Sequence, residues 1–205
     1  IAENGTQIIK YRSMSDADAL IGCHMNQISK NEKVVAIGEI GLDYYWDKEP
    51  EVQESQRYWF GRQIELARET GLPIIVHSRD AAADTMQVMK EHHAEEIPGV
   101  IHCFSYSKEL AKIFVDMGFY IGVGGVVTFS SGRKLKDVVE YLPLEKIVLE
   151  TDCPYLAPTP FRGKRNDSGK LTYVLDQIAE IKGVSREVVE ETTARNAFDL
   201  YKKLK

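Results

Sequence analysis

The stretch VVAIGEIGLD (34–43) is an apolar run of strand length that carries a carboxylate, Glu39, near its end. Three later runs have the same form: IVHSR (75–79), IHCFS (101–105) and LETDCPYL (149–156). A helix-like segment follows each run. Parallel strands with intervening helices place the carboxyl end of every strand on one face of the sheet. We therefore expect four side chains to converge on that face: Glu39, His77, His102 and Asp152.

The rest of the chain alternates between strand and helix patterns in the same way. Strands are predicted at 34–40, 72–77, 100–104, 119–123 and 146–150, and helices at 50–70, 80–96, 108–117, 134–142, 171–181 and 186–203. Asp80 is a plausible cap for the second helix. Five strands that alternate with helices are typical of a parallel α/β sheet.

The four side chains at the strand ends also share a face within their strands. Each stands an even number of positions after an apolar residue of its own run, such as Ile75 before His77 and Val148 before Asp152. Taken singly, either histidine is well explained as a hydrogen-bonded core residue. The carboxylates of Glu39 and Asp152 on the same inward face favour a metal site instead, because burying a carboxylate costs free energy unless it is paired or bound to metal. Two imidazoles and two carboxylates suit Zn²⁺ or Mn²⁺.

Composition limits the kinds of protein this chain can be. Its 205 residues, 43% hydrophobic, are enough for one core, and no apolar run is long enough to cross a bilayer. The cysteines Cys23, Cys103 and Cys153 form no CxxC pair, which argues against a disulfide framework and for a reducing compartment. We expect a cytoplasmic protein with no membrane association and no obligate protein partner, in which Cys103 and Cys153 are packing residues.

A net charge of −5 gives no global attraction for nucleic acid, so phosphate binding would need metal or a local basic patch. The segment PFRGKRND (160–167) supplies such a patch, with Arg162, Lys164 and Arg165. A short charged loop is usually solvated surface. In this loop Arg162 follows Asp152 by ten residues, within reach of the same face, so a role in phosphate binding is the second interpretation. Arg79, directly after His77, is a further candidate for substrate contact.

With these residues in hand, the sequence from about Lys33 onward resembles the TatD family of metal-dependent deoxyribonucleases. The matching motifs occur in order: VVAIGEIGLDYYWD (34–47), LPIIVHSRDA (72–81), HCFS (102–105), GFYIGVGGVVTF (118–129), LETDCPYLAP (149–158), FRGKRN (161–166) and NAFDLY (196–201). A mild departure follows Asn166, where the family usually continues with Glu-Pro and this chain has Asp167-Ser168.

The resemblance implies a (β/α)₈ barrel of the TIM type with two divalent cations, Zn, Mg or Mn, at its carboxyl rim, and DNA as the substrate. Glu39 would bridge the cations, His77 and His102 would complete one site, and Asp152 would serve the other. Glu39 and Asp152 are the implied catalytic residues. The implied phosphate contacts come from the basic segment: Arg162, Lys164, Arg165 and Asn166.

One part of the family pattern is missing. Members open with a strand carrying an HxH pair, and no HxH occurs in this sequence. The five predicted strands would be strands four to eight of the barrel, in a hydrolase domain at 34–205. Residues 1–33 are an uncertain segment, in which 17–26 suits a helix or a strand remnant ending at His24.

Three explanations compete for the missing HxH pair: a truncated polypeptide, a protein that has lost its first units, and a rearranged assembly. We favour a longer parent, because an open remnant exposes a strand edge. The alternatives to a deoxyribonuclease are a catalytically silent binding protein and a hydrolase of another ester or amide.

Overall fold

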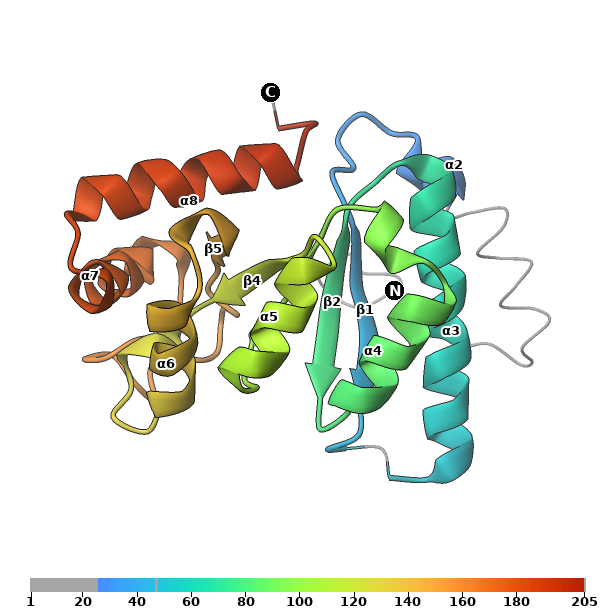
Figure 1. Ribbon diagram of the computed structural model, residues 1–205, viewed down its shortest axis with the longest axis horizontal. Helices are drawn as coiled ribbons and strands as arrows, with labels where there is room; N and C mark the ends of the chain where they lie inside the picture. Colours follow the sequence, from blue (N-terminus) through green and yellow to red (C-terminus); the bar gives the residue numbers. More distant parts are fainter. Residues whose placement is uncertain (1–25, 47, 205) are drawn as a thin grey trace.

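The structure, a computed structural model, describes residues 26–46 and 48–204 (Figure 1). Its sheet has five strands: β1 (Ile37–Asp43), β2 (Ile74–Arg79), β3 (Gly99–Ile101), β4 (Tyr120–Val123) and β5 (Ile147–Leu149). They lie in the order β1-β2-β3-β4-β5, and every neighbouring pair is parallel. Sequential parallel strands joined by helices are the unit of a TIM-type barrel, whereas doubly wound sheets change direction at a switch point. The predicted α/β barrel-type fold is confirmed.

Helices follow the strands along the chain. They are α2 (Asn26–Ser29), α3 (Pro50–Thr70), α4 (Ala82–Glu91), α5 (Lys108–Asp116), α6 (Arg133–Tyr141), α7 (Leu171–Lys182) and α8 (Arg186–Leu200). Short 3₁₀ turns add η2 (Ala94–Glu96), η3 (Gly125–Thr128), η4 (Leu144–Lys146) and η5 (Ser168–Lys170). The predicted bounds of α3 are confirmed, and Gly71 closes it in the left-handed conformation, with φ 67°. The predicted helix at 80–96 is shorter than expected, because Asp80 has φ 53° and Ala81 takes the N-cap position.

The main core lies between the sheet and the helices packed along one face of it, with α3 and α4 beside β1 and β2 in Figure 1 and α5 packed against β4. Fully buried residues from both layers meet there, among them Phe60, Ile64, Ile74, Val76 and Phe114. The opposite face of the sheet has a smaller apolar cluster, which contains Ile75, Val100, Tyr120, Val148, Leu200 and Tyr201. The residues at the end of α8 therefore help to cover the face that carries the candidate ligands.

Strand β1 differs from its prediction by three residues at each end. It spans Ile37–Asp43 rather than 34–40, and its pairing with β2 shifts register between Ile37 and Ile40. Further along, Gly41 (φ 139°) lies so close to β2 that a Cβ there would fall 1.9 Å from the carbonyl oxygen of His77. This close approach brings the end of β1 against the strand that carries His77.

The described residues cover only part of the predicted N-terminal segment at 1–33. The alternatives for 17–26 and His24 lie outside the described residues, apart from Asn26 at the start of α2. Among the helices that the structure describes, none combines the length and apolar character needed to span a membrane.

Candidate metal centre

The four predicted ligands lie near one another: Glu39 and His77 within β1 and β2, His102 directly after β3, and Asp152 in the loop after β5. Glu39 Oε1 lies 2.7 Å from His77 Nδ1 and 3.9 Å from His102 Nε2, and His102 Nε2 lies 3.6 Å from Asp152 Oδ1. His102 directly follows β3, and its backbone N–H continues the strand ladder by donating to the carbonyl of Val76. The structure thus brings together residues 113 positions apart in the sequence (39 to 152) around one imidazole.

A cavity of about 810 Å³, here called the site cavity, contains all four side chains in its lining. The imidazole of His102 is the most enclosed of the four, with 16% of its side chain exposed, whereas Glu39 is 47% exposed. A cavity of this size that is open to solvent and lined by convergent polar groups is the usual form of a ligand site.

A second layer of carboxylates orients both imidazoles. Glu150 Oε2 lies 2.6 Å from His102 Nδ1, and Asp43 Oδ2 lies 3.2 Å from His77 Nε2. Glu150 also accepts a hydrogen bond from the backbone N–H of Cys103. Room for its carboxylate comes from Gly122, where a Cβ would lie 2.5 Å from Glu150 Oε2. Glu150 was not predicted from the sequence, although its place directly after β5 and two residues before Asp152 is a usable signal.

The charges of this cluster shift the pKa values of its members. Burial disfavours the charged form of His102, but the hydrogen bond and charge of Glu150, with Glu39 and Asp152 nearby, raise its pKa to about 9. The hydrogen bond to Glu39 raises the pKa of His77, and the same contact lowers the pKa of Glu39. A raised pKa favours the protonated form of each imidazole, whose positive charge offsets the negative charge of the neighbouring carboxylates.

Donor chemistry decides whether these residues fit a divalent cation. Two imidazoles and two carboxylates are a ligand set that suits Zn²⁺ or Mn²⁺, and Glu150 on His102 Nδ1 is the outer-shell contact that leaves Nε2 available as a ligand. Within the described ranges, no three His, Cys, Asp or Glu side chains already stand in coordinating geometry. Glu39 and His77 instead contact each other directly. The set fits a cation by composition, and binding would replace the proton of His102 and the Glu39–His77 contact.

We predict that Glu150→Gln weakens binding of Zn²⁺ or Mn²⁺ about ten- to a hundredfold, the usual cost of losing an outer-shell carboxylate. The amide keeps the shape of the side chain but loses the charge that orients His102. Calorimetric titration measures the change. The matched control is Glu145→Gln, at an exposed position in η4 outside the site cavity. Equal affinity in both variants would remove Glu150 from the metal centre.

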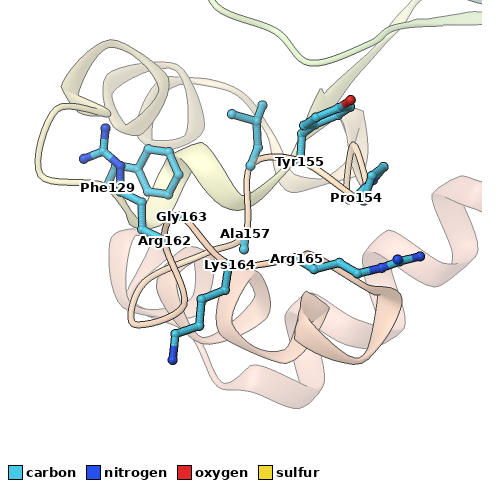
Figure 2. Close-up of a pocket in the computed structure, with 9 residues that line it drawn as sticks. Phe129, Pro154, Tyr155, Ala157, Arg162, Gly163, Lys164 and Arg165 are labelled. Carbon is cyan, nitrogen blue, oxygen red and sulfur yellow. The ribbon is translucent and has the colours of Figure 1, made fainter.

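The basic segment forms a second cavity beside the first. Residues 162–165, here called the basic loop, line a cavity of about 510 Å³ together with Phe129 and residues 154–157 (Figure 2). The guanidinium of Arg162 lies 4.5 Å from the centre of the Phe129 ring, while Lys164 and Arg165 point in other directions. Tyr155 and Leu156 line both cavities, so the basic loop borders the site cavity.

The structure differs from the sequence-based expectation at Asn166. Its side chain is 3% exposed, its amide donates to the Thr151 carbonyl at 2.6 Å, and its oxygen accepts from the Asp167 N–H. The prediction that Asn166 contacts a phosphate directly is therefore wrong for the observed arrangement. Asn166 ties the end of the basic loop to the residue that precedes Asp152.

The two cysteines beside predicted ligands also differ from each other. Burial raises the pKa of Cys103 to about 12, and this residue lines the site cavity because its φ of 46° turns the chain out of the strand. The prediction that both cysteines pack in the core is wrong for Cys153, which is exposed because the residues after β5 form a loop.

Comparisons with known proteins agree with this geometry. The sequence model of the family described as TatD related DNase matches residues 10–202. The chain is 47% identical over 178 residues to an uncharacterized metal-dependent hydrolase, YabD, of Bacillus subtilis (strain 168), covering 87% of this chain and 69% of the relative. Identity is 40% over 177 residues with an uncharacterized metal-dependent hydrolase, YcfH, of Escherichia coli (strain K12), covering 86% and 66%. The chain thus spans about two thirds of the length of these relatives.

Solved structures show the same likeness. The crystal structure of YjjV, a TatD homolog from Escherichia coli K12, superposes with a TM-score of 0.80 at 28% identity, covering 92% of this chain and 82% of that one. A TatD family hydrolase from Entamoeba histolytica gives a TM-score of 0.76 at 27% identity, covering 93% and 69%.

Proposed function

The chain belongs to the TatD family of metal-dependent hydrolases, and from this premise we propose that it cleaves phosphodiester bonds, with DNA as the substrate. The observation that carries the proposal is the adjacency of two cavities. One holds the imidazoles and carboxylates that suit a divalent cation, and the other is lined by the basic loop. A phosphodiester chain needs both: cations at the scissile phosphate and positive charge along the neighbouring phosphates.

In this proposal Glu39, His77, His102 and Asp152 would hold the divalent cations, two per complete site. Bound cations supply Lewis acidity and a water of lowered pKa. Asp152 or Glu39 orients the attacking water and accepts its proton, and both carboxylates are exposed enough to reach solvent in the site cavity. Glu150 and Asp43 fix the orientation of the two imidazoles.

The basic loop offsets charge on the substrate in the same proposal. Arg162, Lys164 and Arg165 carry three positive charges in the lining of the second cavity. The adjoining site cavity contains the carboxylates of Glu39 and Asp152. Arg79 adds a fourth positive charge in the lining of the site cavity itself. Without these groups, the carboxylates would repel a phosphodiester rather than bind it.

Two other functions remain as tests of the proposal. A hydrolase of carboxylic esters or amides would use the same ligands without needing the basic loop. A catalytically silent binding protein would keep the cavities but show no turnover. Assays of the purified chain with Mn²⁺ or Mg²⁺ on single-stranded DNA, an aryl carboxylic ester and an aryl amide separate the three. Cleavage of DNA alone supports the proposal, and cleavage of the ester or amide alone refutes it.

We predict that Arg165→Ala weakens binding of an oligonucleotide about ten- to a hundredfold, because a charge-assisted contact to phosphate contributes about 1.5–3 kcal/mol. The dependence of binding on salt concentration should also become shallower, since fewer counterions are released. Fluorescence anisotropy at several salt concentrations measures both quantities.

The matched control is Lys134→Ala, which removes the same charge from an exposed position in α6 that lines neither cavity. Metal affinity should stay unchanged in both variants. If Arg165→Ala and Lys134→Ala bind the oligonucleotide equally well, the basic loop is solvated surface and the phosphate proposal loses its main support.

A further inference from the structure

An aromatic and cationic cluster borders the site cavity, and metal or phosphate binding does not account for its two rings. It consists of Tyr45 and Trp46, just after β1, and Arg79, at the end of β2. Trp46 is 72% exposed and Tyr45 is 45% exposed. Trp46 and Arg79 both line the cavity that contains the candidate ligands.

We infer that Tyr45, Trp46 and Arg79 form a subsite that stacks a nucleobase next to the phosphate being cleaved. The inference rests on the proposed function and deepens it, because it adds recognition of a base to recognition of the backbone.

The geometry of the cluster supports stacking. The guanidinium of Arg79 lies 3.9 Å from the centre of the Tyr45 ring and 5.7 Å from that of Trp46. The two rings meet edge to face, with centroids 4.8 Å apart and planes at 89°. Arg79 thus holds Tyr45 in place by a cation–π contact. The Trp46 ring keeps most of its surface in solvent, where a flat partner can lie against it.

The large exposed fraction of the Trp46 side chain is best explained by a partner that covers it when bound. An indole is among the largest apolar side chains, and burying it against the core would stabilise the fold. Single exposed apolar residues are common on protein surfaces. Trp46 differs from them, because it lines the cavity that contains the candidate ligands and lies near the guanidinium of Arg79. A second exposed ring, Tyr155, lines the same cavity and is 71% exposed.

The chemistry of the cluster favours a base over other flat ligands. Every nucleobase has a π-face, and stacking on aromatic side chains and on Arg is how proteins hold unpaired bases. The basic loop on the other side of Tyr155 suits the phosphates that continue from such a nucleotide. A base inside a duplex has no free face, so the subsite would select an unpaired nucleotide at the scissile position.

The test compares two substrates of the same length and charge: an oligothymidylate and an oligonucleotide of abasic tetrahydrofuran residues. Anisotropy measures binding, and hydrolysis with Mn²⁺ measures KM and kcat. The wild-type chain should bind the oligothymidylate about ten- to a hundredfold more tightly than the abasic strand, the usual effect of one stacked base. Trp46→Ala should reduce its affinity for the oligothymidylate to that for the abasic strand, and leave abasic binding unchanged.

Two further variants keep the result interpretable. Trp46→Phe retains a ring and should preserve most of the base preference. Tyr141→Ala is the matched control, because Tyr141 is also exposed, at 49%, and also stacks with a cation, the ammonium of Lys108, 5.8 Å from its centroid, but lines neither cavity. This control should bind both strands as the wild type does.

Each remaining outcome overturns the inference. If Trp46→Ala weakens binding of both strands equally, Trp46 acts in folding or in phosphate binding. If it weakens binding of neither strand, the indole does not contact the substrate. If the wild type cleaves both strands with equal KM, the stacking subsite is refuted and the phosphodiesterase proposal stands. If it neither binds nor cleaves either strand, both fail.

Discussion

His102→Asn should lower metal-dependent phosphodiester hydrolysis by roughly a thousandfold, because this imidazole is the common contact of the candidate centre. Its Nε2 lies 3.9 Å from Glu39 and 3.6 Å from Asp152, while Glu150 holds its Nδ1 at 2.6 Å. By neutralising charge, metal ions stabilise the transition state of hydrolysis by several kcal/mol. Each 1.36 kcal/mol of activation free energy changes the rate tenfold. Losing this ligand should also weaken Zn²⁺ binding in a calorimetric titration.

The control for this variant is His93→Asn. His93 is exposed, with 61% of its side chain in solvent, and lies away from the site cavity. Its φ of 55° is in the left-handed region, which Asn tolerates better than most residues, so the control should fold normally. Circular dichroism establishes folding of both variants. A folded His102→Asn variant with undiminished turnover would exclude the proposed centre.

The fold and the convergence of the four side chains were predictable from the sequence for one physical reason. In a parallel sheet, the direction of each strand and the position of its last residue fix the edge where its side chain lies. The runs around His77 and His102 are apolar on the face toward the helices, so their strand assignment followed from composition. The sequential strand order then brought those ends together without any further information.

Details that depend on the chain leaving a strand were not predictable in the same way. Cys103 and Asp152 have φ values of 46° and 52°, so strand alternation stops applying at these positions. Cys103 therefore lines the cavity, whereas strand alternation would turn its side chain to the face opposite His102. Asn166 was predicted to face phosphate because it adjoins Arg165, yet its amide is taken by the Thr151 carbonyl. Both outcomes depend on loop hydrogen bonds, which spacing in the sequence does not encode.

The position of Glu150 shows a further limit. A carboxylate two residues before a predicted ligand is visible in the sequence, but its partner, His102, lies 48 residues away. The space for the contact is made by Gly122 on a third strand. Three separate segments must be in place before the role of Glu150 is defined, so only the folded structure could assign it.

Asp152→Asn should lower the rate of hydrolysis by about a hundred- to a thousandfold, while leaving one tight metal-binding event in place. In the proposed centre, Glu39, His77 and His102 would supply three ligands within this chain, the number that a stable zinc site usually has. Asp152 lies 3.6 Å from the same nitrogen of His102 that faces Glu39, with 36% of its side chain exposed, where it can orient water. Changing it to an amide removes a base and a charge without changing shape, so kcat should fall more than metal affinity.

The control for Asp152→Asn is Asp80→Asn, which makes the same chemical change on a matched backbone. Asp80 has φ 53° against 52° for Asp152, is exposed, and lines neither cavity. Asn tolerates this conformation, so neither variant should lose its fold. Single-turnover kinetics and calorimetry on the same preparations separate the two effects. Equal loss of metal affinity and rate in Asp152→Asn would mean that Asp152 belongs to the tight site. Two equally tight binding events in the wild type would require ligands beyond these four, because Asp152 and a shared Glu39 are too few to hold a second cation alone.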